Sequence, residues 1–213
     1  MKSVYLSRDM INTPGNIMTP VAIQSYIRTL VKDYKVPIRM EVFNTAACKK
    51  KGLNLLVAVG SGSDAPRQAG LVILKYNGGG PKYCILGKGI TQDTGGYSLK
   101  PVQDIPSMKS DKSGAVIALS TILCCARLGL KVDLIAMLPM AQNSIGPSAV
   151  VPGDIVTAYN GMTVEITDPD AEGRLILADA LAYAVDHYPE YQMIDIATLT
   201  GEQEAMSCKK FST

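Results

Sequence analysis

Four charged side chains within one short stretch are the first candidates for chemistry in this sequence. Residues 168–174 read Asp-Pro-Asp-Ala-Glu-Gly-Arg, and an apolar run with helical spacing follows directly. The free N–H groups and the dipole of a helix stabilise acidic side chains at its start, so this cluster alone could be an ordinary helix start. A second cluster on glycine-rich turns favours a functional interpretation, and it comprises Lys88, Asp93, Lys100 and Asp111.

The four carboxylates of Asp93, Asp111, Asp170 and Glu172 suggest a metal centre. Carboxylates brought together in a dry site are unstable unless cations neutralise them. Two divalent ions would provide that charge, and paired ions are suited to hydrolysis by an activated water. Asp170 and Glu172 are two residues apart, so an extended backbone would direct both side chains the same way.

The basic side chains near these carboxylates need a role of their own. Lys88 and Lys100 would each require a lowered pKa, so that a neutral amine could bind metal, or a negative substrate oxygen to stabilise. Arg174 stays charged and could hold a carboxylate or a small anion. The glycines around Lys88 would also suit a phosphate-binding loop, although neither GxGxxG nor GxxxxGK(S/T) is present. Asp111 by itself could be a solvated charge at a helix start.

Composition argues against several other mechanisms and partners. The 213 residues are 47% hydrophobic, enough for one domain with a sizeable core, and the net charge is +2. This balance does not favour nucleic acid or a membrane surface, and no apolar stretch reaches the length of a bilayer span. The single histidine, His187, lies near a predicted helix end, which disfavours an imidazole-based mechanism. Five cysteines without CxxC spacing indicate reduced thiols in a cytoplasmic protein.

Helices and apolar strands are expected to alternate along the chain. Helices are predicted over residues 3–12, 20–35, 45–51, 113–128 and 172–187. Strands are predicted over residues 37–43, 53–59, 69–76, 82–86, 132–137, 155–159, 162–166 and 193–197. Glycine-containing turns predict two hairpins, one from the strands 69–76 and 82–86 and one from the strands 155–159 and 162–166.

This alternation indicates an α/β domain with a mixed, largely parallel sheet covered by helices on both faces. In such sheets ligands bind beyond the carboxyl ends of the strands. The predicted turns at residues 88–93 and 198–201 each follow a strand, and the segment 170–174 opens a helix. Residues 139–152 are predicted to form a long loop rich in Gly, Pro, Ser and Asn.

At these charged clusters the sequence closely resembles the leucyl aminopeptidase (cytosol aminopeptidase) family of two-metal peptidases. The family motifs are V-G-K-G-I-T-F-D-(S/T)-G-G-x-x-(I/L)-K-P, M-K-x-D-M-x-G-A and N-T-D-A-E-G-R-L. The corresponding segments here are LGKGITQDTGGYSLKP at 86–101, MKSDKSGA at 108–115 and DPDAEGRL at 168–175. Weaker matches extend the resemblance over about residues 3–201.

The resemblance implies a metal-dependent aminopeptidase that hydrolyses the N-terminal bond of short peptides. Lys100 would polarise the scissile carbonyl, and Arg174 would hold a bicarbonate acting as general base toward a water that bridges two divalent ions. The ions could be zinc, manganese or magnesium, and relatives form hexamers. The implied metal ligands are Lys88, Asp93, Asp111, Asp170 and Glu172, and the implied substrate pocket contains Met108, Thr198 and Gly201.

Several residues depart from the family motifs without removing an implied ligand. Gln92 replaces an aromatic residue beside Asp93. Lys112 and Ser113 replace an apolar residue and a small one, and Lys112 is expected to place an extra cation near the metals. Asp-Pro at 168–169 replaces Asn-Thr. These changes could weaken metal binding or alter specificity.

Family members also carry a separate N-terminal domain, and their catalytic domain continues beyond the Thr-Leu-Thr-Gly segment. Residues 1–213 are therefore expected to be a partial catalytic domain that lacks the N-terminal domain, with a sheet incomplete at the C-terminal end. Residues 202–213 are expected to be a divergent tail. The alternative to an active enzyme is a catalytically incompetent fragment that retains metal binding or self-association.

Overall fold

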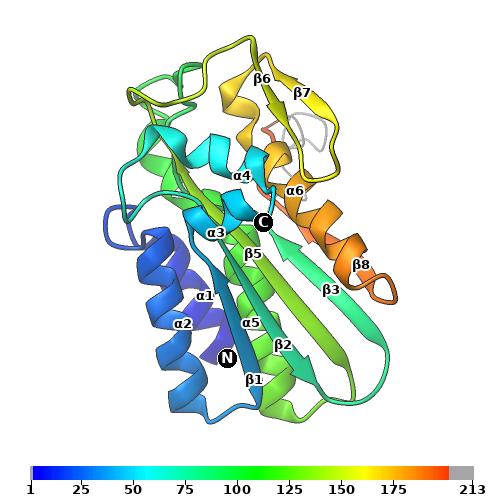
Figure 1. Cartoon of the computed structure of the whole chain (residues 1–213). Coiled ribbons are helices and arrows are strands. Elements are labelled where there is room, and N and C mark those ends of the chain that lie inside the picture. Colours follow the sequence, from blue (N-terminus) through cyan, green and yellow to red (C-terminus); the bar gives the residue numbers. More distant parts are fainter. Residues whose placement is uncertain (1, 202–213) are drawn as a thin grey trace.

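A six-stranded mixed sheet lies between two layers of helices (Figure 1). The computed structural model describes residues 2–201. The strand order is β1-β2-β5-β3-β8, and β4 pairs with the far end of β5. The pairings of β3 with β5, β3 with β8 and β4 with β5 are parallel, whereas those of β2 with β1 and β5 are antiparallel. The predicted mixed, largely parallel sheet is confirmed.

The strands of this sheet alternate their side chains between two cores, as the period of two requires. Leu71 and Ile73 of β2 contribute to one core, and Val72 and Leu74 contribute to the other. The strands are β1 (Ile38–Phe43), β2 (Gly70–Asn77), β3 (Lys82–Gly87), β4 (Gly89–Asp93), β5 (Asp133–Asn143) and β8 (Gln192–Ile196). A separate hairpin joins β6 (Asp154–Thr157) to β7 (Thr163–Ile166), as predicted.

Helices cover both faces of the sheet, so that each core is closed (Figure 1). One face carries α1 (Lys2–Asn12), α2 (Pro20–Tyr34) and α5 (Ser113–Leu128). The other face carries α3 (Thr45–Lys50), α4 (Asn54–Val59) and α6 (Glu172–His187). Short 3₁₀ helices are η1 (Gly60–Gly62), η2 (Ile105–Lys112) and η3 (Pro169–Ala171). Within residues 2–201, no helix combines the length and the apolar character that crossing a bilayer demands.

Helix boundaries follow the sequence closely where capping residues are present. Thr19 accepts a hydrogen bond from the backbone N–H of Ala22, and Pro20 occupies the first turn of α2. Asn44 caps α3 in the same way through the N–H of Ala47. The bounds predicted for α5 and α6 are confirmed.

The structure corrects the prediction for residues 53–59, which form α4 and not a strand. An apolar run of this length fits a buried strand or a buried helix equally well by its pattern alone. The tertiary environment selects the helix, because the backbone N–H of Leu56 in its first turn donates to the buried carboxylate of Asp179 on α6.

Three further predictions about the sheet are wrong. The strands β2 and β3 form no hairpin, because β5 lies between them and pairs with both. The predicted turn at 88–93 contains the strand β4. The predicted loop at 139–152 begins later, because residues 139–143 extend β5 to pair with β4. Long-range pairing decides all three, and it leaves no mark in the local pattern.

The cysteines within the described part are free thiols. Burial raises the pKa of both Cys48 and Cys84 to about 12, which keeps these two thiols in the protonated form. Cys124 and Cys125 are half-buried in α5, and Cys208 lies outside the described residues.

The buried carboxylate of Asp179 joins α6 to α4 and to the turn between β6 and β7. Its Oδ2 accepts from Leu56 N at 3.1 Å and its Oδ1 accepts from Tyr159 N at 2.8 Å. Substitution Asp179→Ala leaves both N–H groups without this partner, so we expect it to lower the free energy of unfolding by about 1–3 kcal/mol. Urea denaturation followed by circular dichroism measures this loss. The exposed Asp33→Ala variant is the control, and equal stability of the two variants would contradict the role of Asp179.

Candidate active site

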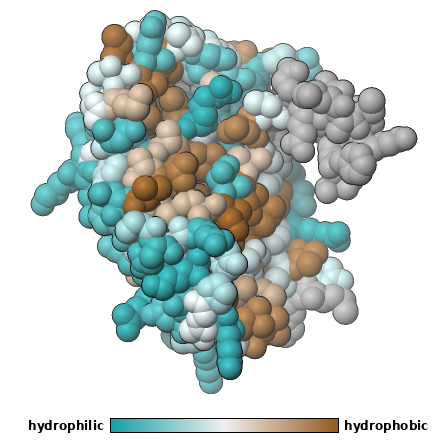
Figure 2. Space-filling model, turned by 90° about the vertical axis from the view of Figure 1, so that its right-hand side faces the viewer, coloured by the Kyte–Doolittle hydropathy of each residue, from teal (hydrophilic) through white to brown (hydrophobic). Residues whose placement is uncertain are grey.

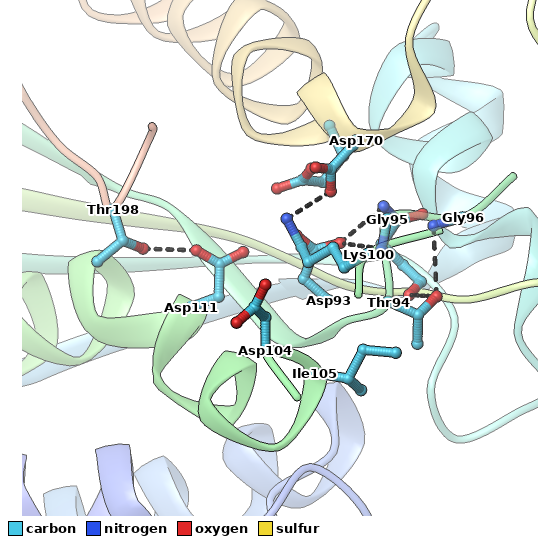
Figure 3. Close-up of polar contacts among 12 residues, drawn as sticks. Asp93, Thr94, Gly95, Gly96, Lys100, Asp104, Ile105, Asp111, Asp170 and Thr198 are labelled. Atoms are coloured by element: carbon cyan, nitrogen blue, oxygen red, sulfur yellow. Dashed lines mark hydrogen bonds and ion pairs between the residues drawn. The ribbon is translucent and has the colours of Figure 1, made fainter. Parts of the chain in front are cut away.

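The charged residues predicted to do chemistry meet beyond the carboxyl ends of the parallel strands β3, β4 and β8 (Figure 3). Lys88 lies between β3 and β4, and Asp93 ends β4. Asp111 belongs to η2, Asp170 belongs to η3, and Glu172 is the first residue of α6. Segments far apart in the sequence therefore place their acidic and basic groups at one edge of the sheet, where such folds bind ligands.

Lys88 forms the buried centre of one half of this site. Its Nζ lies 2.8 Å from Asp111 Oδ1 and 2.8 Å from Glu172 Oε1. It also donates to the backbone carbonyl of Thr198 at 2.9 Å. Burial disfavours the charged ammonium, but the two carboxylates outweigh that effect and raise the pKa of Lys88.

Lys100 forms the centre of the other half of the site. Its Nζ lies 2.9 Å from Asp93 Oδ2 and 2.5 Å from Asp170 Oδ1, and Figure 3 shows it between the two carboxylates. Burial opposes the charge of Lys100 as well, but both aspartates reverse the effect and raise its pKa. Two ammonium groups thus neutralise part of the charge of four carboxylates.

The carboxylates remain electrostatically strained despite these ion pairs. Burial, with the nearby charges of Asp93 and Asp111, raises the pKa of Glu172 to about 8, although Lys88 opposes the shift. Burial likewise raises the pKa of Asp111 and the pKa of Asp170. The site therefore holds more negative charge than its lysines compensate, which is the condition under which added cations bind.

Two glycines allow the backbone to close around Lys88. A Cβ added to Gly173 in the first turn of α6 would lie 2.7 Å from Lys88 Cε and 2.9 Å from its Nζ. A Cβ on Gly114, at the start of α5, would lie 2.1 Å from the carbonyl oxygen of Ile196. Any side chain at these positions would push Lys88, α5 or β8 away from the site.

Asn143 is a site residue that sequence reasoning missed. Its Nδ2 donates to Asp93 Oδ1 at 2.8 Å and to the carbonyl of Pro169 at 3.0 Å. These two hydrogen bonds link the end of β4 to η3. The backbone N–H of Gly95 donates to the same Asp93 oxygen at 2.9 Å. No feature of the sequence marked Asn143, because its role depends on the pairing of β4 with β5.

The residues present fit a divalent metal centre. Carboxylate oxygens of Asp93, Asp170 and Glu172 all lie within 4.8 Å of one another. Asp111 Oδ2 and Glu172 Oε2 are buried and have no hydrogen-bond partner among the described residues. Buried polar atoms without partners are costly, and cation binding would satisfy them. Oxygen donors of this kind suit hard or borderline ions.

The remaining predicted site residues differ in their burial and in their contacts. Thr198 donates from Oγ1 to Asp111 Oδ1 at 2.6 Å, so it touches the acidic cluster directly (Figure 3). Met108 is half-buried in η2, and Gly201 is exposed in a turn. Arg174 is exposed on α6 and forms no ion pair with a residue in the range 2–201.

Two expectations about the site are corrected. Asp170 and Glu172 do not lie on an extended backbone, since η3 leads directly into α6, yet their carboxylates still converge. Lys112 does not place its charge at the metal centre, because its Nζ donates to backbone carbonyls at the end of α1 and in η2. Burial and the charge of Lys109 lower the pKa of Lys112 to about 8. His187 lies at the exposed C-terminal end of α6, as predicted, and its ring stacks on Tyr183.

The family is identified by sequence comparison. The model for the catalytic domain of the cytosol aminopeptidase family matches residues 5–213, so the chain belongs to this family. The probable cytosol aminopeptidase of Nocardia farcinica is 43% identical over 202 residues, which are 95% of this chain and 39% of that protein. The probable cytosol aminopeptidase of Paraburkholderia xenovorans is 41% identical over 199 residues, 92% of this chain and 38% of that protein. The chain thus spans about two fifths of the length of these curated relatives.

Several solved structures share the fold of this chain. The leucine aminopeptidase of Caenorhabditis elegans matches 97% of this chain and 42% of its own, with a TM-score of 0.87 and 33% identity. The leucyl aminopeptidase of Trypanosoma brucei, in complex with actinonin, matches 95% of this chain and 40% of its own, with a TM-score of 0.89 and 30% identity. The bottromycin maturation enzyme BotP, in complex with Mn, matches 96% of this chain and 44% of its own, with a TM-score of 0.86 and 35% identity.

Metal binding should depend on pH in a defined direction. An ion that binds Glu172 must displace the proton this carboxyl holds below its raised pKa of about 8, and an ion that binds Lys88 must displace another. We expect the affinity for Mn²⁺ to rise with pH, by about tenfold per pH unit for each proton released. Calorimetric titrations below and above the pKa of Glu172 measure the slope. An affinity that is flat or falls as pH rises would contradict this assignment.

Proposed function

We propose that the chain carries the catalytic site of a metal-dependent aminopeptidase, which hydrolyses the N-terminal peptide bond of short peptides with two divalent cations. The observation that carries the proposal is the convergence of four carboxylates around two lysines, with buried oxygens of Asp111 and Glu172 that lack partners in the described part of the chain. Membership in the cytosol aminopeptidase family supports the reaction class, and the names of the relatives support a cytosolic location.

The acidic cluster would hold the ions in two adjoining groups. Asp93, Asp170 and Glu172 offer one set of converging oxygens, and Asp111 and Lys88 adjoin it through Glu172. When bound, such ions lower the pKa of a water and polarise the carbonyl that the water attacks. Zinc, manganese or magnesium would suit these donors, and the Mn complex of BotP makes manganese a sensible first probe.

Lys100 and Arg174 would act on the substrate side of the cluster. The ammonium of Lys100 is held by two carboxylates and stays charged, so it can stabilise negative charge that develops on the scissile carbonyl. Arg174 has its guanidinium exposed on the first turn of α6, where it would hold bicarbonate as a general base. Met108, Thr198 and Gly201 would line the pocket for the N-terminal side chain of the peptide.

A second candidate function is self-association without catalysis. Within residues 2–201 the outer strand β8 pairs with β3 alone. Apolar side chains are exposed on and beside it, among them Ile194 and Leu199, with Leu181 and Val185 on α6. Figure 2 shows hydrophobic residues across the middle of the face where β8 and α6 lie. Such a face favours assembly. Size-exclusion chromatography with light scattering tests this candidate, and the hexamer implied by the family resemblance is one of its outcomes.

Hydrolysis of leucine p-nitroanilide with added Mn²⁺ or Zn²⁺ tests the enzyme directly. We expect metal-dependent release of p-nitroaniline, and we expect Glu172→Ala to reduce it by about 100-fold or more, because a buried oxygen donor is lost. The exposed Glu165→Ala variant of β7 is the control and should keep full activity. No activity in the unsubstituted chain, or equal activity in the Glu172→Ala variant, would refute the proposed function of this chain.

Lys100→Met separates substrate chemistry from metal binding. The substitution removes the ammonium but keeps an unbranched side chain, so we expect kcat to fall by about 10²–10³-fold. Mn²⁺ affinity should be retained or increased, because a competing cation between Asp93 and Asp170 is removed. Steady-state kinetics and calorimetry on the same preparation check both parts. Weaker Mn²⁺ binding together with an unchanged kcat would contradict this role.

A further inference from the structure

Lys112 is a fully buried lysine whose charge is held only by backbone oxygens. Its relative exposure is 0%, and its Nζ donates to the carbonyls of Ile11 at 3.2 Å, Thr13 at 2.8 Å and Lys109 at 2.5 Å. No carboxylate in the range 2–201 pairs with it. A buried ammonium is costly unless its donors are satisfied, and here three carbonyls satisfy all three N–H groups.

The carbonyls come from two elements that the chain must bring together. Ile11 and Thr13 lie at the C-terminal end of α1, where carbonyls lack helical partners and the helix dipole favours a positive charge. Lys109 lies in η2, one turn before Lys112 itself. The ammonium therefore caps α1 from a neighbouring element and joins α1 to η2.

The position of η2 matters for the acidic cluster, because η2 carries Asp111. The Asp111 carboxylate reaches Lys88 and Thr198 on one side of the backbone, while the adjacent Lys112 side chain enters the protein interior on the other side. A shift of η2 relative to α1 would displace both side chains together. The family motif M-K-x-D-M-x-G-A has methionine where this chain has Lys112, so the motif itself does not supply this ammonium.

We propose that Lys112 is a positioning residue, whose ammonium occupies a cage of three backbone carbonyls and thereby fixes η2 and the Asp111 carboxylate. Three carbonyl oxygens around one cation are also a suitable environment for a free monovalent cation. The cage left by a shortened side chain should therefore accept ammonium or methylammonium. The link to Asp111 as a metal ligand rests on the proposed function, whereas the cation cage itself does not.

Chemical rescue of Lys112→Ala tests the proposal. We expect the substitution to weaken Mn²⁺ binding by about tenfold or more and to lower the melting temperature, as loss of a supporting contact does. Methylammonium chloride should restore part of both quantities relative to the same concentration of sodium chloride, because the small cation replaces the missing charge. Calorimetry and thermal unfolding provide the two readouts.

Two matched variants distinguish the cage from simple loss of packing. Lys112→Met fills the space with an apolar chain of similar length, so methylammonium should improve neither its Mn²⁺ affinity nor its melting temperature. Lys109→Ala removes a neighbouring lysine side chain of η2 but keeps the carbonyl that Lys112 contacts, so it should retain the original Mn²⁺ affinity.

The outcomes separate this proposal from the proposed function. Unchanged Mn²⁺ affinity in Lys112→Ala, or a loss that methylammonium does not reverse, would overturn the positioning role. A chain that binds Mn²⁺ but hydrolyses no peptide analogue would refute the enzyme and leave this proposal intact. If the unsubstituted chain binds no Mn²⁺, the melting temperature decides: a rise for Lys112→Ala in methylammonium supports the cage, and no rise refutes it.

Discussion

The mutual repulsion of four carboxylates in a nearly dry space is the constraint on which the rest of this structure depends. Asp93, Asp111, Asp170 and Glu172 come from three separate stretches of the chain, and without neutralisation their full or partial burial would oppose folding. Lys88 and Lys100 reduce the repulsion by bridging two carboxylates each. The raised pKa of Glu172 shows that the compensation is partial. The same imbalance that costs stability prepares the site for cations.

Close backbone approach is the second requirement, and it follows from the first. An ammonium at 2.8 Å from two carboxylates must lie where the ends of β3, α5 and α6 meet. Gly114 and Gly173 permit that meeting, because a Cβ at either position would collide with Ile196 or with Lys88. The central sheet then serves as a rigid support, with both faces closed by helices and its strand ends directed at the site. Preorganisation of this kind is what hydrolysis by a positioned water requires.

Many helices and strands could be predicted from local sequence patterns, and the predictions that were wrong share one physical cause. Thr19 with Pro20 marked the start of α2, and periodicity located α5 and α6. Residues 53–59 were predicted as a strand because an apolar run lacks a distinguishing period, and the contact with Asp179 decided for α4. The hairpin expected from β2 and β3 failed because β5, distant in sequence, inserts between them. Strand pairing between distant segments depends on the packing of the whole sheet, which no local window contains.

The sequence by itself determined which chemical groups are available, since glycine-rich turns with charged residues at fixed spacing specify a carboxylate-and-lysine site and a family. Tertiary structure alone decided how those groups pair: Lys88 with Asp111 and Glu172, and Lys100 with Asp93 and Asp170. It also decided that Asn143 donates a hydrogen bond to Asp93, and that the Lys112 ammonium donates to a carbonyl at the end of α1. The physical reason is that ion pairs and hydrogen bonds act over a few ångströms in space, and only the folded chain sets those distances.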